Sequence, residues 1–292
     1  MSERPPTIDS LAAQRWLSRN PDVSPWLHEE VGRRMVERLG WIVAKPGTWL
    51  SWQPALGGRE AEALVTSLYP DAKRFRQVSP VDIAKFAPET GANPWWSPKR
   101  WLTGDSAWPE QGAGMVWANM ALHQASDPQT LLAHWHSRLA TDGFLMFSCL
   151  GPDTLKELRA LYARLGWPSP THEFTDMHDW GDMLVQAGFA EPVMDMERIE
   201  LTFATPQRLL KELRELGRNL HVDRPKALRG RGWLKRLHDA LMSLAVPDAG
   251  GQLKLTFEIV YGHAYKPQPR LKVAPQTSIS LNDMREHLQK RA

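Results

Sequence analysis

The fold of this protein is decided by residues 115–150, which read MVWANMALHQASDPQTLLAHWHSRLATDGFLMFSCL. The short apolar run from Met115 to Ala118 predicts a buried strand, and residues 128–139 place apolar side chains at the period of a helix. The run from Gly143 to Leu150 is almost continuously apolar, as in a central strand of a parallel sheet. A strand, a helix and a second strand in this order predict an α/β fold whose sheet is covered by helices on both faces.

The same alternation continues on both sides of this stretch. Before it, the pattern predicts helices at residues 10–17, 25–39 and 59–68 and strands at residues 48–52, 73–78 and 100–102. After it, the pattern predicts helices at residues 153–165 and 175–188 and strands at residues 193–203 and 253–264. A helical segment separates the last two strands, and we expect these strands to add an antiparallel edge to a mostly parallel sheet.

These patterns divide the chain into four parts. They are N-terminal helices at residues 1–45, a core at residues 46–204 and 252–267, a basic helical insertion at residues 205–251, and a tail at residues 268–292. The insertion therefore precedes the last strand of the core.

Composition limits the class of protein. With 42% hydrophobic and 24% charged residues, the chain has the composition of an ordinary globular protein. Its single cysteine, Cys149, excludes an intramolecular disulfide framework and fits a reducing compartment. The N-terminal residues lack the apolar stretch of a secretory signal, and no run reaches the roughly 20 apolar residues of a membrane helix. We therefore expect a cytoplasmic protein with no membrane partner, of unknown oligomeric state.

Positive charge is concentrated in the insertion. The chain carries a net charge of +3, whereas residues 205–240 hold ten basic and four acidic residues and thus carry +6, which leaves −3 for the rest. Such a surface attracts an acidic partner. The plain alternative is a solvated helical face. Nucleic acid is another acidic partner, but the sequence has no helicase, zinc-finger or RNA-recognition signature, so we expect no nucleic-acid binding.

Several strings of this sequence, in this order, resemble the malonyl-acyl-carrier-protein O-methyltransferases of biotin synthesis, which depend on S-adenosylmethionine (SAM). These strings are residues 117–148, LGPDTLKELR at 150–159, FTDMHDWGDMLVQAGFAEPVMD at 174–195, ALRGRGWLKRLHDAL at 227–241 and FEIVYGHAYKP at 257–267. The resemblance implies a Rossmann-like methyltransferase fold with SAM as the cofactor.

The resemblance also implies where the cofactor would lie. The matching positions are Gly57, Gly58, Gln77, Asp105, Ser106 and Asn119. Glycines after the first strand let the backbone pass close to the cofactor. This turn is degenerate here: TWLSWQPALGG at residues 48–58 keeps Gly57 and Gly58, lacks the family's aspartate and spaced glycines, and contains the bulky Trp52 and Pro54. The second strand of the family ends in an acidic residue that accepts the ribose hydroxyls, and Gln77 puts a neutral amide there. Asp105 matches the acidic residue beside the adenine, and Asn119 follows the strand that ends at Ala118.

The implied reaction is methyl transfer to the free carboxylate of a malonyl group on acyl carrier protein. A carboxylate is already an anion, so positioning and desolvation replace a general base, and the sequence identifies no catalytic residue. Acyl carrier proteins are strongly acidic, and the basic residues that suit their docking are Arg214, Arg218, Lys226, Arg229 and Arg231. Two alternatives stay open: a non-catalytic binding or regulatory protein that keeps the fold without binding SAM, and a methyltransferase with another substrate.

Three further features have two interpretations each. His123 follows Asn119 by four residues and either orients a substrate or is a partly exposed histidine at a helix start. The segment His134-Trp135-His136 lacks cysteine or carboxylate companions at ligand spacing, so we predict no metal site there. Cys149 lies within a predicted buried strand, where a thiol is usually inert.

Overall fold

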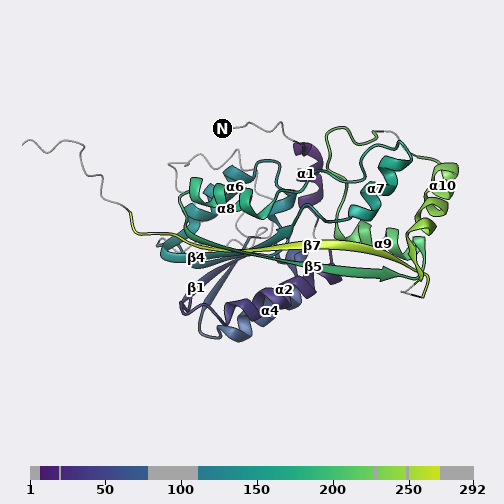
Figure 1. Cartoon of the computed structure of the whole chain (residues 1–292). Coiled ribbons are helices and arrows are strands. Elements are labelled where there is room, and N and C mark those ends of the chain that lie inside the picture. Colours follow the sequence, from purple (N-terminus) through teal and green to yellow (C-terminus); the bar gives the residue numbers. More distant parts are fainter. Residues whose placement is uncertain (1–6, 20, 78–110, 227–228, 248–249, 270–292) are drawn as a thin grey trace, which may run out of the picture.

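The computed structural model describes residues 7–19, 21–77, 111–226, 229–247 and 250–269. These residues form one seven-stranded sheet with helices on both faces (Figure 1). The strands are β1 (Thr48–Trp52), β2 (Lys73–Gln77), β3 (Ala113–Ala118), β4 (Leu139–Leu150), β5 (Ala190–Phe203), β6 (Ala245–Val246) and β7 (Gln252–Tyr265). The α-helices are α1 (Ser10–Leu17), α2 (Trp26–Leu39), α3 (Pro54–Gly57), α4 (Arg59–Leu68), α6 (Pro128–Arg138), α7 (Lys156–Arg164), α8 (Met177–Gln186), α9 (Pro206–Leu216) and α10 (Arg231–Leu241). Two short 3-10 turns are η2 (Leu122–Gln124) and η3 (Met242–Leu244).

The strand order is β2-β1-β3-β4-β7-β5, with β6 paired to β7. Strands β1 to β4 are parallel to one another, and β7 is antiparallel to both β4 and β5. This arrangement confirms the mostly parallel sheet and the antiparallel pairing of the last two strands. Strand β7 lies between β4 and β5, so β5 forms the edge. The strand predicted at residues 100–102 lies outside the described residues.

Alternate residues along the strands build two hydrophobic layers. Met115 and Trp117 of β3 face the layer that contains α2 and α4, and Val116 and Ala118 face the layer that contains α6 and α8. Figure 1 shows these two helix pairs on opposite faces of the sheet. The period of two in a strand places successive side chains on opposite faces, and both faces are apolar because both are covered.

Short polar side chains start several helices where the sequence predicts a start. The N-cap residues Asp9, Asp127, Asp176 and Thr205 each accept a hydrogen bond from a backbone N–H in the first turn of their helix. Such caps satisfy donors that have no partner within the helix.

The helix predicted from Asp153 begins later, at Lys156, because residues 151–155 form a turn bonded to β7. The backbone N–H of Gly151 donates to Glu258 O at 2.9 Å, and that of Leu155 donates to Thr256 O at 2.7 Å. The Glu258 carboxylate in turn accepts from the backbone N–H of Asp153 at 3.0 Å. These bonds join the strings LGPDTLKELR and FEIVYGHAYKP, about a hundred residues apart, into one structural unit.

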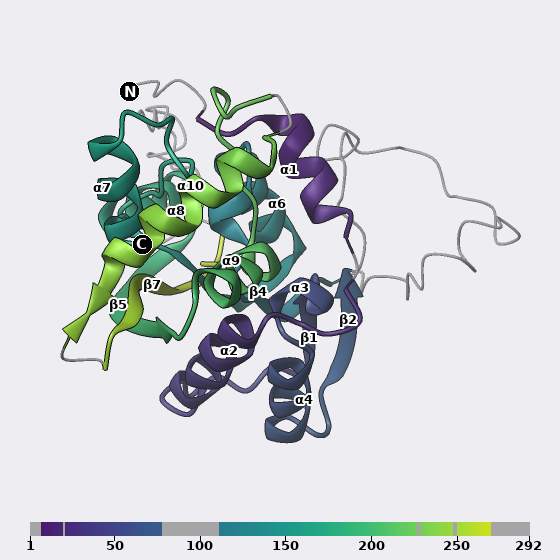
Figure 2. The same cartoon turned by 90° about the vertical axis from the view of Figure 1, so that its right-hand side faces the viewer.

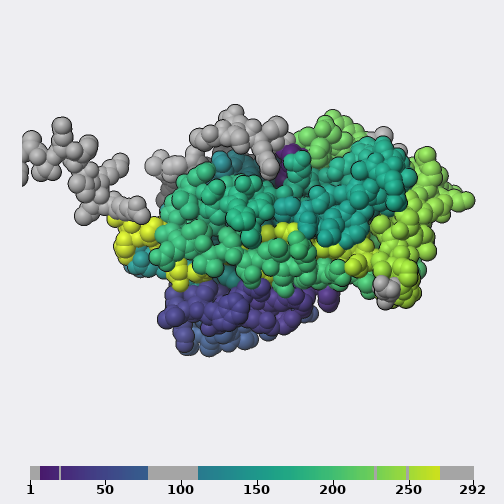
Figure 3. Space-filling view, in the orientation of Figure 1, coloured from purple at the N-terminus to yellow at the C-terminus, as the bar shows by residue number. Residues whose placement is uncertain are grey.

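The insertion contains α9 and α10 and packs against α7, and together they form one end of the molecule (Figure 3). Helix α1 adjoins the loop between α9 and α10 (Figure 2). There the backbone N–H of Asp9 donates to Leu220 O at 2.8 Å, and that of Val222 donates to Thr7 O at 3.0 Å. The Asp9 carboxylate also pairs with Arg224 at 2.8 Å. The N-terminus and the insertion are therefore joined. No helix among the described residues is long and apolar enough to span a membrane.

Candidate functional site

The parallel strands β1, β2 and β3 end at one edge of the sheet, here called the carboxyl edge, where open α/β sheets bind ligands. Trp52 and Gln77, the last residues of β1 and β2, are paired in register. The next residue after β1, Gln53, donates from its backbone N–H to Gln77 O at 2.8 Å. The predicted cofactor residue Gln77 therefore lies beside the turn that follows β1.

This turn leads through α3 to Gly57 and Gly58, and side chains do not fit at either position. A Cβ atom on Gly57 would lie 2.9 Å from the backbone oxygen of Asn119. Gly58 has a φ of +122°, and a Cβ atom there would lie 2.8 Å from a carboxylate oxygen of Glu29. The Glu29 carboxylate is held in this position because it accepts hydrogen bonds from the backbone N–H groups of Arg59 and Ala61, at the start of α4. The two glycines are thus required by close packing of the backbone.

Asn119 is the centre of a buried polar cluster, which also contains Ser148, His28 and the backbone of Gly57. Its side-chain N–H groups donate to His28 O, at 2.7 Å, and to Gly57 O, and its oxygen accepts from the Ser148 hydroxyl at 2.6 Å. The residue is only 1% exposed. Asn119 therefore holds the turn after β1 against β4, while its contact with the cofactor stays a prediction.

His28 supports the same turn from α2. Its ring nitrogen Nδ1 lies 2.6 Å from Leu56 O, and burial lowers the pKa of His28 to about 4. The ring is therefore neutral near pH 7, and its Nδ1–H donates to the carbonyl oxygen.

Trp52, which directly precedes the turn, points into the layer beneath α6. Its ring packs edge-on against Trp135, with the ring centroids 5.6 Å apart, and lies 5.8 Å from the ring of His134. The bulk of this side chain is therefore directed into the core. Asp105 and Ser106, the other two predicted cofactor residues, lie outside the described residues.

A cavity of about 240 Å³, here called the inner cavity, lies beyond the carboxyl ends of β3 and β4. Its apolar lining includes Leu150, Leu155, Leu158, Phe174, Leu210, Leu213 and Phe257. Its polar lining includes His123, Gln124, His172, Arg214 and Arg218. Such a mixture of apolar walls and few polar groups is typical of small-molecule sites.

A chain of hydrogen bonds sets the orientation of the His123 ring. The indole N–H of Trp16 is a donor only, and it donates to the side-chain oxygen of Gln124 at 2.8 Å. This leaves the Gln124 amide nitrogen facing His123 Nε2 at 3.2 Å, so Nε2 is the acceptor and Nδ1 carries the proton. Burial, and then the neighbouring His172 and His28, lower the pKa of His123 well below its usual range, which keeps the ring neutral.

His123 thus places a free N–H group in the wall of the inner cavity. Its Nδ1 is buried and has no hydrogen-bond partner in the described part of the chain, as is also true of His172 Nδ1. His172 donates from Nε2 to His123 O at 2.9 Å, so its Nδ1 is an acceptor. Being 7% exposed, His123 is not the partly exposed histidine of the plain interpretation.

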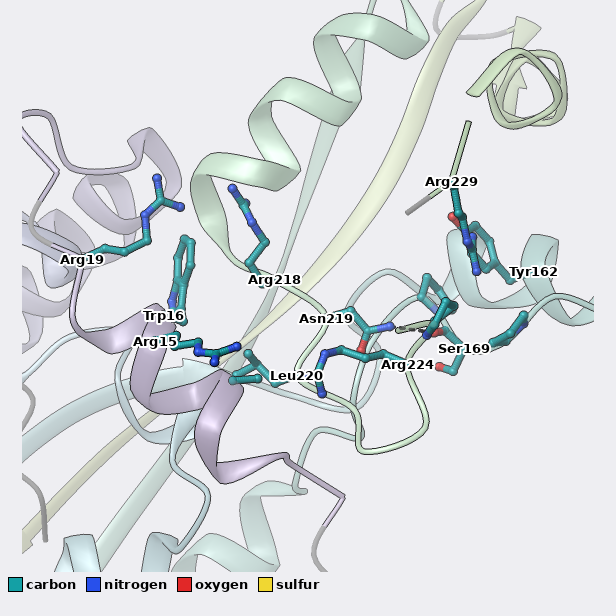
Figure 4. Close-up of a pocket in the computed structure, with 14 residues that line it drawn as sticks. Arg15, Trp16, Arg19, Tyr162, Ser169, Arg218, Asn219, Leu220, Arg224 and Arg229 are labelled. Carbon is teal, nitrogen blue, oxygen red and sulfur yellow. Dashed lines mark hydrogen bonds between the residues drawn. The ribbon is translucent and has the colours of Figure 1, made fainter. Parts of the chain in front are cut away.

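A second cavity, of about 610 Å³ and here called the outer cavity, adjoins the first (Figure 4). The two share the lining residues Trp16, Tyr162, Pro170, Arg218, Asn219 and Leu220. The lining of the outer cavity contains the five arginines Arg15, Arg19, Arg218, Arg224 and Arg229 and no acidic residue among those described. It is therefore a strongly cationic cavity beside the inner one.

The predicted docking residues fall into three places. Arg218 and Arg229 line the outer cavity, Arg214 and again Arg218 line the inner one, and Lys226 and Arg231 are exposed and belong to neither lining. Arg15 and Arg19 were not predicted from the sequence, since they are about two hundred residues away from the insertion. The pairing of α1 with residues 220–222 brings them there.

Two negative findings concern the described residues alone. They contain no group of three or more His, Cys, Asp or Glu side chains arranged to hold a metal ion. Cys149 is fully buried in β4, and burial raises the pKa of its thiol, so the thiol stays protonated and unreactive.

The sheet order, the glycine turn after β1 and the cavity beyond β3 and β4 define a Rossmann-like fold of the SAM-dependent methyltransferase class. No family model matches this chain. Two curated relatives share 37% and 35% identity with it; both are named malonyl-acyl-carrier-protein O-methyltransferase. The first relative, from Gallionella capsiferriformans, aligns over 90% of this chain and 93% of its own length. The second relative, from Nitrosospira multiformis, aligns over 91% of this chain and 89% of its own length. The chain belongs to the malonyl-acyl-carrier-protein O-methyltransferase family.

A solved structure with a similar fold is a SAM-dependent methyltransferase from Archaeoglobus fulgidus. It is 13% identical to this chain, and the two structures superpose with a TM-score of 0.39. The superposition covers 82% of this chain and 94% of the chain in the solved structure. The family assignment rests on the sequence relatives and not on this likeness.

Proposed function

We propose that this protein transfers a methyl group from SAM to the free carboxylate of a malonyl group carried by acyl carrier protein. The observation that carries the proposal is family membership over about nine tenths of the chain. The cationic outer cavity beside the mainly apolar inner cavity agrees with a substrate presented by an acidic protein. Neither the relatives nor the site favours a non-catalytic protein.

The carboxyl edge fits the cofactor. Gly57 and Gly58 bring backbone without side chains to this edge, and Trp52 points away from it. The amide of Gln77 can both accept from and donate to ribose hydroxyls. The residues that we propose to hold the cofactor are Gly57, Gly58, Gln77, Asp105, Ser106 and Asn119. When bound, SAM supplies an electrophilic methyl group.

The chain's own residues would position the acceptor. A carboxylate oxygen would take the methyl group while the donor's sulfur would keep the electron pair of the broken carbon–sulfur bond, so no residue of the chain would have to move a proton. The apolar walls of the inner cavity exclude water from this anion. We assign Arg214 to the second carboxylate oxygen, since its guanidinium has no ion-pair partner among the described residues. The free N–H of His123 would donate to the thioester carbonyl.

Titration calorimetry with SAM tests whether the protein is an enzyme or a non-catalytic relative. We expect the wild-type protein to bind SAM and Asp105→Ala to bind it more weakly. Gln77→Glu should bind about ten- to a hundredfold more tightly, because a charged acceptor strengthens the bond to the ribose. Thermal unfolding of each variant checks that it is folded. Absence of heat from all three folded proteins would support the non-catalytic alternative instead.

A further inference from the structure

We propose that the outer cavity is a binding site for a phosphate ester, namely the phosphodiester of the phosphopantetheine arm through which the carrier protein presents its acyl group. This inference rests on the proposed function and adds a site to it. The site is formed by residues 12–19, in and just after α1, by residues 218–225 and Arg229 of the insertion, and by Tyr162 and residues 168–170, which are far apart in the sequence.

The lining of the outer cavity carries an excess of positive charge. Of the five arginines in the lining, only Arg224 has an acidic partner among the described residues: it pairs with Asp9 at 2.8 Å. The side chains of Arg15, Arg19, Arg218 and Arg229 make no ion pair with any residue that the structure describes. Cations gathered without counter-charges repel one another, and a bound anion would relieve this repulsion.

Two of these arginines lie against the ring of Trp16. The guanidinium carbon of Arg19 lies 4.9 Å from the centroid of the Trp16 ring, and that of Arg218 lies 5.2 Å from it. Trp16 itself is 4% exposed and fixed by its bond to Gln124. Burial, and then the charges of Arg19 and Arg214, lower the pKa of Arg218, which reflects how closely these cations are held.

At the opposite end of the cavity, Arg229 and Tyr162 lie near each other in Figure 4. The guanidinium carbon of Arg229 lies 3.9 Å from the centroid of the Trp233 ring. A guanidinium stacked on an aromatic face keeps its edge N–H groups available, and these match phosphate oxygens in a bidentate manner. Rigid aromatic rings therefore support cations at both ends.

The outer and inner cavities lie side by side, since they share six lining residues. A phosphopantetheine thioester is anionic at its phosphate and neutral along its amide-containing arm, and its acyl group is at the far end. The cavities follow the same order, because the arginines lie in the outer cavity and the apolar walls and His123 in the inner one. Between them, the shared residue Asn219 offers an amide side chain.

The test compares methyl transfer to malonyl-phosphopantetheine and to malonyl-pantetheine, which lacks the phosphate. For the wild type we expect kcat/KM to be about ten- to a hundredfold higher with the phosphate present, as for a charge-assisted bond. In the double variant Arg19→Ala/Arg218→Ala the two substrates should become equivalent, because the advantage given by the phosphate is lost. Lys211→Ala, which removes an exposed cation of α9 outside both linings, should behave as the wild type.

The outcomes separate the site from the function. Equal kcat/KM for the two substrates in the wild type, or an equal loss for both in the double variant, would overturn the phosphate site and leave the methyltransferase function intact. If the wild type methylates neither substrate nor the malonyl carrier protein, the proposed function fails. The site is then tested by calorimetry with phosphopantetheine, where binding that the double variant loses supports it and absence of binding overturns it.

A third substrate identifies the source of the phosphate ester. Malonyl-coenzyme A carries the same arm on a nucleotide in place of a protein. A higher kcat/KM with the malonyl carrier protein supports the carrier's arm as the occupant. Equal or higher values with malonyl-coenzyme A would overturn that assignment in favour of a free thioester.

Discussion

The two polar clusters of this molecule differ in where their hydrogen bonds and charges find partners. In the buried cluster around Asn119, each side-chain hydrogen bond ends on another part of the chain, at His28, Gly57 or Ser148. In the outer cavity, four of five arginines have no acidic partner among the described residues. The first cluster is therefore complete by itself, whereas the second keeps positive charge that no acidic group among the described residues balances.

This difference separates stability from binding. Removing a member of a satisfied buried cluster leaves donors or acceptors without partners and destabilises the fold. Removing an exposed cation leaves nothing buried unsatisfied, so its effect is on the ligand and on salt dependence.

The largest expected effect is that of Asn119→Ala. It leaves the carbonyl oxygens of His28 and Gly57 and the Ser148 hydroxyl without their partner, and we expect the free energy of unfolding to fall by about 3–5 kcal/mol. Urea denaturation measures this. The matched control is Asn219→Ala in the outer cavity, where water can replace the lost bonds and the expected loss is below about 1 kcal/mol. Equal losses at the two sites would remove the distinction between the clusters.

The next effect concerns carrier binding. Reversing Arg214, Arg218 and Arg229 to Glu should weaken binding of the carrier protein by about a hundredfold at low salt, while the melting temperature changes little. The wild-type affinity should fall steeply with added salt. Surface plasmon resonance over a range of salt concentrations measures both, and an unchanged affinity in the triple variant would refute docking at the insertion.

A smaller effect is expected from pH. The pKa of His28 is about 4 in the folded protein and near 6.5 when exposed, so the unfolded chain binds more protons between these values. The stabilisation is complete above pH 6.5 and is lost as the pH falls toward 4. For His28 alone this amounts to about 2 kcal/mol between pH 7 and pH 5.

The pH effect is measured by urea denaturation at pH 7 and pH 5. The variant His28→Gln should lose part of the pH dependence, and His178→Gln, which changes an exposed histidine of α8, should keep it. The same dependence in all three proteins would show that His28 is not the source.

The smallest effect belongs to His123. Loss of one neutral hydrogen bond to the thioester should lower kcat/KM by about fivefold to tenfold in His123→Ala. His123→Asn keeps an N–H donor close to the position of Nδ1 and should recover most of the activity. Steady-state rates of both variants check this, and a failure of Asn to recover activity at normal stability would argue for a packing role alone.

Much of the fold follows from local pattern. The apolar run at residues 143–150 and the helical period at residues 128–139 are strong signals, and the structure has β4 and α6 there. The predicted start of the next helix, at Asp153, was wrong. Helix α7 begins at Lys156, because residues 151–155 form hydrogen bonds to β7 instead of a helix cap. That partner is about a hundred residues away, and local pattern carries no information about it.

The site was less predictable for the same reason. Gly57, Gly58 and Asn119 were named separately from the sequence, but their packing against one another depends on the order of β1 and β3 in the sheet. Arg15 and Arg19 were missed, because only the pairing of α1 with the insertion places them among the other arginines.

The most direct test of the whole account is transfer of a labelled methyl group from SAM to carrier protein bearing either a malonyl or an acetyl group. We expect labelled methyl on the malonyl carrier alone. Mild base should release this label, because the expected product is a methyl ester. Label on neither carrier, or equally on both, would contradict the account.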